Sequence, residues 1–165
     1  MKINNLNINL LINNMDTIED LFDIKIKKNT GDYYIEFIYK SIDITDLRMI
    51  KFVKKTKEVI NLLKKDEVKN VYFIFILNNL IIPANFNVLK DFIQIFHDNI
   101  DLMINKVKFT IIQNETNLFK IFINIFKQYY KPYKPLFLCK NDEERQMCLT
   151  DEKYREKLPN ITNLL

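Results

Sequence analysis

Glycine is almost absent from this sequence, because Gly31 is the only one among 165 residues. Phosphate-binding loops such as GxxxxGK[ST] and GxGxxG need several glycines, which let the backbone approach a phosphate closely. The sequence therefore excludes nucleotide sites of that kind. Gly31 itself lies in NTGD, between two runs of alternating apolar and polar residues, where a tight hairpin turn needs a positive φ.

Residues that commonly carry catalysis are also scarce. His97 is the only histidine, Ser41 is the only serine, and the two cysteines, Cys139 and Cys148, do not form a CxxC pair. Histidine-based triads and zinc sites need more such groups, and two lone thiols are typical of a reducing compartment. The acidic run 142–144 fits the first turn of a helix, where the helix dipole favours negative charge. We expect no enzymatic activity, no metal and no cofactor.

Long hydrophobic runs are missing as well. The start, MKINNLNINLLINNMD, is too interrupted by asparagine to be a signal peptide, and no apolar run approaches the roughly 20 residues that cross a bilayer. We therefore expect a cytoplasmic protein without a transmembrane segment. The net charge of +4 comes from lysines interleaved with acids, whereas nucleic-acid binders concentrate positive charge on one face. We expect no specific nucleic-acid binding.

Asparagine, isoleucine and lysine are abundant, as codon usage in an AT-rich genome would produce. A large DNA virus, a protist or a bacterium could have such a genome. On composition alone we favour a giant virus, in which case the expected location is the host cytoplasm.

The first half of the chain predicts a hairpin followed by a helix. LFDIKIKK and YYIEFIYK alternate as strands do, on either side of the NTGD turn. From Asp43 the apolar period becomes helical, and Thr45 or Asp43 can cap the helix. The expected core stripe of this helix consists of Ile50, Val53, Ile60 and Leu63, supported by Leu47 and Phe52.

The second half alternates strands with helices. VYFIFIL is apolar throughout, as expected of a central strand covered on both faces. A helix should follow from Pro83 to about Asn105, with a core stripe of Leu89, Phe92, Phe96, Ile100 and Met103. VKFTIIQ, a helix over 115–129, PLFLCK and a helix capped by Asn141 complete the order. We predict an α/β domain over 21–149, with a mostly parallel sheet, an N-terminal antiparallel hairpin and about four helices. An extension (1–20) precedes it, and a polar tail (150–165) follows it.

This order resembles the STAS domain, the fold of bacterial anti-sigma factor antagonists. The similarity runs from about Leu21 to Leu149. It is carried by the hairpin and first helix, by VKNVYFIFILNNLIIPANFNVLKDFI as central strand, loop and second helix, and by KVKFTIIQNETNLFKIF and KPLFLCKNDEERQ. The lipid-binding CRAL-TRIO domain has a related topology and is a second candidate family.

The resemblance implies a recognition surface, but not the phospho-switch of some STAS domains. Those members carry an Asp-Ser-Ser/Thr-Gly-like segment at the start of the second helix. The corresponding residues here, about 82–86, are IPANF and contain no hydroxyl group. We expect this surface to hydrogen-bond a partner's backbone through Asn78, Asn79, Asn85 and Asn87.

The helix expected over 115–129 carries two apolar stripes. Leu118, Ile121, Phe122, Ile125 and Tyr129 suffice to cover a sheet. The second stripe, formed by Phe119, Ile123, Phe126 and Tyr130, is either covered by neighbouring segments or exposed as a contact patch. Nearby tyrosines and lysines suit a protein interface or peripheral contact with a lipid surface.

We therefore expect a non-catalytic, STAS-like protein-interaction module that binds a protein partner or itself. The alternative is a carrier of a small ligand, lipid or nucleotide, with CRAL-TRIO-like topology. That alternative requires a large apolar cavity between the sheet and the helices. An enzyme would require converging ionisable groups in a cleft.

Overall fold

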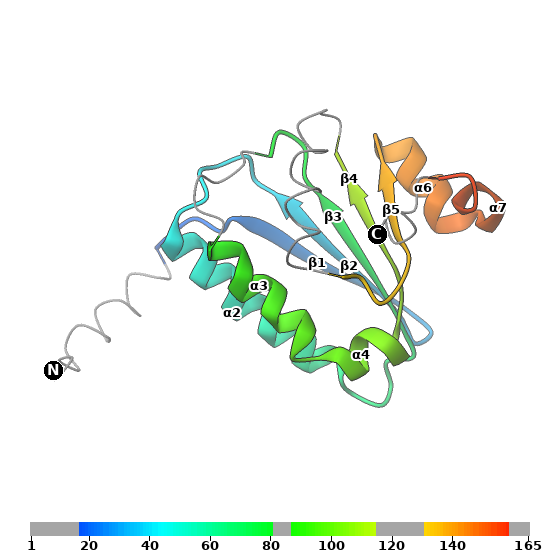
Figure 1. Ribbon diagram of the computed structural model, residues 1–165, viewed down its shortest axis with the longest axis horizontal. Helices are drawn as coiled ribbons and strands as arrows, with labels where there is room; N and C mark the ends of the chain where they lie inside the picture. The colour runs from blue at the N-terminus through cyan, green and yellow to red at the C-terminus, as the bar shows by residue number, and fades with distance from the viewer. Residues whose placement is uncertain (1–16, 81–86, 115–130, 159–165) are drawn as a thin grey trace, which may run out of the picture.

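The computed structural model describes residues 17–80, 87–114 and 131–158 (Figure 1). The strands are β1 (Phe22–Asn29), β2 (Asp32–Tyr39), β3 (Asn70–Ile76), β4 (Val107–Gln113) and β5 (Leu136–Cys139). The helices in the described residues are α2 (Asp46–Leu63), α3 (Asn87–His97), α4 (Ile100–Asn105), α6 (Asp142–Thr150) and α7 (Glu152–Arg155).

The five strands form one sheet in the order β1-β2-β3-β4-β5. β1 pairs with β2 in antiparallel orientation, and every later pair is parallel. The predicted α/β class, the mostly parallel sheet and the N-terminal hairpin are thus confirmed. VYFIFIL provides the central strand, as its uninterrupted apolar sequence indicated.

The hairpin turn confirms the geometric role of the single glycine. Gly31 has φ +91°, and Thr30 before it has φ 43°. The carbonyl oxygen of Gly31 accepts hydrogen bonds from the backbone N–H groups of Lys69 (2.9 Å) and Asn70 (3.2 Å). The turn is therefore tied to the entrance of the central strand.

Two apolar clusters lie on opposite faces of the sheet. The larger one, called the main core here, packs α2, α3 and α4 against one face; Figure 1 shows α2 and α3 lying side by side there. The smaller one, called the second core, packs Cys148 of α6 against Phe109, Ile111, Phe137 and Cys139 of the sheet. Strand β4 connects both clusters, because Ile112 faces the main core while Phe109 and Ile111 face the second core.

The buried side of α2 differs from the prediction. Met49, Phe52, Thr56, Val59, Ile60 and Leu63 are buried, whereas Ile50 is 50% exposed and Leu47 is 41% exposed. The prediction was wrong for Ile50 and Leu47 because apolar residues occur on both sides of the true stripe. Successive residues lie about 100° apart around a helix of 3.6 residues per turn. Turning α2 about its axis by that angle therefore exchanges the predicted buried residues for the observed ones. Thr45 caps the helix as predicted, accepting from the N–H of Arg48.

The helix predicted from Pro83 to Asn105 is two helices in the described residues, α3 and α4. The break is at Asn99, whose backbone is not helical (φ −124°, ψ 39°). Its side-chain amide donates to the carbonyl oxygen of Ile95 at 2.6 Å, so it replaces helical backbone pairing with a local bond. Because the break rotates α4 relative to α3, Ile100 is 40% exposed and Leu102 is buried, so the predicted burial of Ile100 was wrong. Phe96 and Met103 are buried as predicted.

Candidate functional site

The candidate site lies where the parallel strands end at their carboxyl termini. The chain leaves β3 through a turn in which the N–H of Leu80 donates to the carbonyl oxygen of Leu77 (3.2 Å). That oxygen also accepts a hydrogen bond from the side-chain amide of Asn114 (2.7 Å), just after β4. The N–H of Leu77 in turn donates to the carbonyl oxygen of Gln113 (2.9 Å). The loop between Leu77 and Leu80 is therefore held to the end of β4 by both polar groups of the Leu77 backbone.

Asn78 and Asn79, two of the predicted contact residues, form this turn. Asn79 has φ 56° and an exposed side chain; asparagine tolerates this backbone conformation better than most residues. The carbonyl oxygen of Asn78 accepts a hydrogen bond from the hydroxyl of Ser41 (3.3 Å). The side-chain Oδ1 of Asn78 is buried and has no hydrogen-bond partner among the residues that the structure describes. A buried acceptor of this kind carries a free-energy cost until a donor reaches it.

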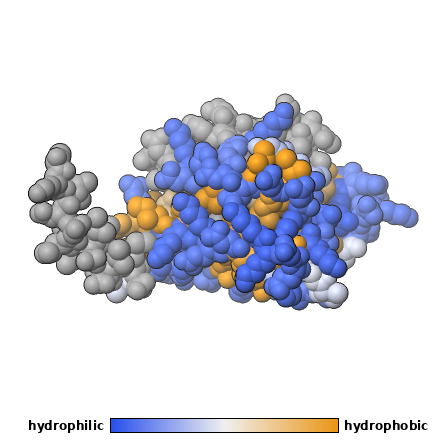
Figure 2. Space-filling model, turned by 90° about the horizontal axis from the view of Figure 1, so that it is seen from below, coloured by the Kyte–Doolittle hydropathy of each residue, from blue (hydrophilic) through white to orange (hydrophobic). Residues whose placement is uncertain are grey.

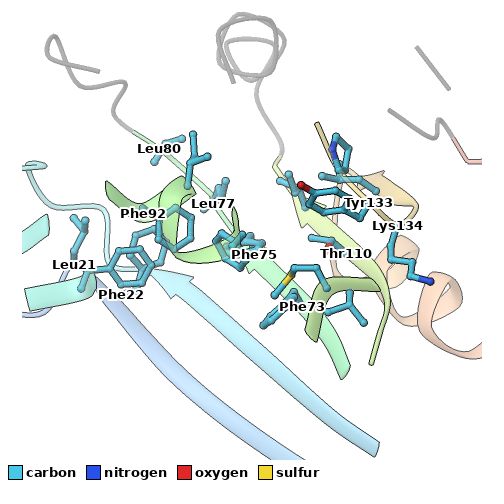
Figure 3. Close-up of a pocket in the computed structure, with 18 of the residues that line it drawn as sticks. Leu21, Phe22, Phe73, Phe75, Leu77, Leu80, Phe92, Thr110, Tyr133 and Lys134 are labelled. Carbon is cyan, nitrogen blue, oxygen red and sulfur yellow. The ribbon is translucent and has the colours of Figure 1, made fainter. Parts of the chain in front are cut away.

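An apolar pocket opens beside this turn, between the sheet and the helices of the main core (Figure 3). In the figure, Phe75 from β3 lies beside Phe92 from α3, and Phe73 lies below them, with Leu77 and Leu80 at one end and Thr110, Tyr133 and Lys134 on the opposite side. The cavity volume is about 100 Å³. Apart from Lys134, Tyr133 and Thr110, the described lining side chains are all apolar. The arrangement can hold an apolar group, and it offers few groups for acid–base or nucleophilic chemistry.

The size of the pocket limits its occupant. A cavity of about 150 Å³ lined by apolar side chains accommodates benzene, so the 100 Å³ found here fits one apolar group of at most about that size. A complete long-chain lipid needs much more room. This pocket is therefore smaller than the large cavity that the small-ligand alternative requires.

The other predicted contact residues are placed less fully. Asn87 is the first residue of α3. Asn85 and the second stripe, Phe119, Ile123, Phe126 and Tyr130, lie outside the described residues, so their roles stay predictions. His97, expected at the edge of an apolar stripe, is half-buried at the end of α3, and its ring centroid lies 6.5 Å from that of Tyr133.

A polar cluster next to the site was not predicted. Gln113, buried at the end of β4, accepts a hydrogen bond from Nη1 of Arg145 (2.8 Å) and donates one to Oδ1 of Asp142 (3.0 Å). Arg145 and Asp142 also form an ion pair at 3.2 Å, and Nε of Arg145 is buried without a hydrogen-bond partner in the described part of the chain. The only sequence signal was the spacing of Asp142 and Arg145, which places them one helical turn apart. Their meeting with Gln113 depends on the tertiary fold.

The outer surface of the helical layer is less suited to a large interface. Figure 2 shows a mostly hydrophilic surface on the side that carries α2 and α4, with hydrophobic residues in separate small areas. Scattered apolar residues of this kind, such as Ile50 and Ile104, are normal on protein surfaces. Among the features of the described chain, the pocket and its asparagine turn are thus the best candidate site.

Comparisons with known proteins assign neither a family nor a function to the chain. No protein-family model matches the chain, and no curated protein matches it significantly. In the part of the chain that the structure describes, no three or more histidine, cysteine, aspartate or glutamate residues are grouped as metal ligands. None of the helices found there is long and apolar enough to span a membrane.

Proposed function

We propose that this protein is a non-catalytic interaction module of STAS-like fold. It binds a protein partner by receiving one apolar side chain of that partner in the pocket beside Asn78 and Asn79. The apolar lining of the pocket is the observation that carries the proposal. Interfaces often depend on one apolar or aromatic anchor that fills such a pocket and is surrounded by polar contacts.

The asparagine turn supplies those polar contacts. The exposed side-chain amide of Asn79 can both donate a hydrogen bond to the partner's backbone and accept one from it. Because the turn is fixed to β4 through Leu77, these groups are held in place before the partner arrives. Such preorganisation lowers the entropic cost of binding.

The small-ligand alternative is supported by the same apolar lining, but the volume argues against a whole lipid. The connection from β4 to β5 returns at Pro132, Tyr133 and Lys134, which line the pocket. Residues 115–130 of that connection lie outside the described residues.

Random peptides displayed on phage and selected on the immobilised protein would test the proposal. The test variant is Thr110→Phe, which places a ring in the pocket. The matched control is Lys108→Phe, whose exposed parent residue lies on the same strand and does not line the pocket. Circular dichroism would verify that both variants fold.

Selected peptides should share one apolar anchor residue. They should bind Thr110→Phe at least about tenfold more weakly than wild type and should bind Lys108→Phe as wild type does. If the pocket excludes peptides but takes up a long-chain fatty acid stoichiometrically, the small-ligand alternative replaces this proposal. If neither binds, the pocket is part of the chain's own packing, and the proposal fails.

A further inference from the structure

The two cysteines do not form a sequence motif, but the fold places them in the same buried cluster. Cys139 is the last residue of β5, and Cys148 lies nine positions later, in α6. Both are free thiols in the second core, with 2% and 0% of their surface exposed. Both side chains belong to the same buried cluster, in which α6 packs against β5. The fold therefore brings the only two thiols of the chain together in one cluster.

The surroundings make the two sulfurs unequal. Arg155 lies beside Cys148, where its Nη1 donates to the carbonyl oxygens of Cys148 (2.7 Å) and Leu149 (3.3 Å). The guanidinium group also lies over the ring of Phe109, 5.0 Å from its centroid. Interaction with the Cys139 thiol lowers the pKa of Cys148, and the charge of Arg155 adds to this, although burial acts in the opposite direction. Interaction with the Cys148 thiol, burial and the negative charge of Glu144 raise the pKa of Cys139, although Arg145 opposes them. Cys148 is thus the more nucleophilic thiol.

The attachment of α6 and α7 explains how a reagent reaches these buried sulfurs. Cys148 is the only buried side chain of α6, and α7 has none. A segment with so few buried apolar groups opens locally at a lower free-energy cost than unfolding of the main core requires, even though Arg145 is hydrogen-bonded to Gln113. Opening of α6 would expose Cys148 without unfolding the main core.

We propose that Cys139 and Cys148 are a modification site that forms a reversible disulfide and fastens α6 to the end of β5. The co-reactant is a low-molecular-weight disulfide such as oxidised glutathione. The Cys148 thiolate attacks one of its sulfurs, the glutathione S–S bond breaks, and one glutathione thiolate leaves. The Cys139 thiolate then attacks the Cys148 sulfur of the mixed disulfide and displaces the second glutathione.

The exchange is balanced. Two protein thiols are oxidised to one disulfide, one glutathione disulfide is reduced to two thiols, and the two protons from the protein thiols pass to the two glutathione thiolates. The product cross-links α6 and β5 over Phe109 and Phe137, and so suppresses the local opening that admits the reagent. The reduced form retains that opening.

The test uses the full-length protein, equilibrated under native conditions in buffers of increasing oxidised-to-reduced glutathione ratio. Acid quenching, maleimide labelling and mass spectrometry then count the remaining thiols. We expect both thiols to disappear together in a monomer that carries no glutathione. The disulfide closes a loop of ten residues, 139–148, and should therefore raise Tm by roughly 5–10 °C.

Cys148→Ala and Cys139→Ala serve as controls, because neither can form the bond and neither should gain Tm in oxidised glutathione. The thiol count is made on the wild-type protein, so it tests the proposal even if a variant folds poorly. Three results would overturn the proposal: two thiols that persist in oxidised glutathione alone, a stable mixed disulfide on a single cysteine, or a disulfide between two chains.

Discussion

The ammonium group of Lys106 lies 2.7 Å from the carbonyl oxygen of Lys65, just beyond the C-terminal end of α2. The same group donates to the carbonyl oxygens of Leu63 and Lys64, each at 3.2 Å. The last carbonyls of a helix have no partners within the helix and form the negative end of its dipole. One lysine from the entrance of β4 therefore closes the end of a helix about 40 residues earlier in the chain.

Replacing Lys106 by methionine should lower the free energy of unfolding by about 1–2 kcal/mol, because the carbonyls lose a charged donor while the apolar stem is retained. Urea denaturation followed by circular dichroism measures this change. Lys108→Met is the matched control, since Lys108 is exposed two residues later, on β4, and it should change stability by less than about 0.5 kcal/mol. An equal effect of both substitutions would show that Lys106 does not stabilise the end of α2.

Asp20 anchors the chain segment before β1 to α2. Its carboxylate lies 2.6 Å from Nζ of Lys55 and 3.0 Å from Nζ of Lys51, and Lys51 also donates to the carbonyl oxygen of Ile18 at 2.7 Å. Burial alone would raise the pKa of Asp20, but the hydrogen bonds and charges of Lys55 and Lys51 together outweigh burial and lower the pKa below its usual value.

A carboxyl group with a lowered pKa in the folded state stabilises the fold at pH values above its unfolded pKa, and this contribution is lost as the pH falls through the folded pKa. Asp20→Asn should therefore be less stable than wild type at pH 7, by about 1 kcal/mol for this partly exposed pair. The difference should shrink steadily below pH 3.8, the ordinary value. Thermal unfolding at pH 7, 4 and 2.5 would show this. A difference that is independent of pH would mean that the charge of Asp20 is not what holds the segment.

Local patterns in the sequence predicted much of the fold. The alternation of the hairpin, the apolar run of β3 and the caps Thr45 and Asn141 all depend on neighbouring residues, and the structure contains each of them. The face that α2 buries was predicted less well, because apolar residues on adjacent positions make two rotations of the helix nearly equivalent. Packing against Phe37 and Phe22 of the sheet, through the ring of Phe52, selects one of them.

The candidate site was predicted only in part. The asparagine turn follows a recognisable strand, so its position could be inferred from the general location of sites in α/β folds. The pocket, the Gln113–Arg145 pair and the cluster that contains Cys139 and Cys148 involve residues from several elements. Their distances are set by the sheet order and by the docking of α6, and no single stretch of sequence encodes them.

Substitutions at the two adjacent turn residues, Thr30 and Gly31, should change the stability of the protein in opposite directions. Thr30 has φ 43°, which is unfavourable for a β-branched residue, whereas asparagine is common in this region and precedes glycine in many tight hairpins. Thr30→Asn should therefore stabilise the protein by about 0.5–1 kcal/mol.

Gly31→Ala should destabilise the protein by about 1 kcal/mol or more, since φ is +91° there. The new Cβ would also lie 3.2 Å from Cγ and Cδ of Lys69. Calorimetric Tm values for the two single variants give the comparison. If both substitutions lowered Tm equally, turn geometry would not be the determinant of stability at this site.

The buried amide of Gln113 should be energetically coupled to Arg145. Gln113→Leu removes the acceptor 2.8 Å from Nη1 of Arg145 and leaves an arginine whose side chain is only 11% exposed with fewer partners. We expect a loss of about 2–3 kcal/mol, because a buried charged donor that loses its acceptor is not rehydrated. Arg145→Leu alone should likewise cost stability by leaving the Gln113 carbonyl without its donor.

The double variant Gln113→Leu, Arg145→Leu removes both polar groups at once. Its loss should therefore be smaller than the sum of the two single losses by about 1 kcal/mol or more. Chemical denaturation of all four proteins completes this cycle. Strict additivity would contradict the coupling and would leave Cys148, the one buried side chain of α6, as the main attachment of that helix to the sheet.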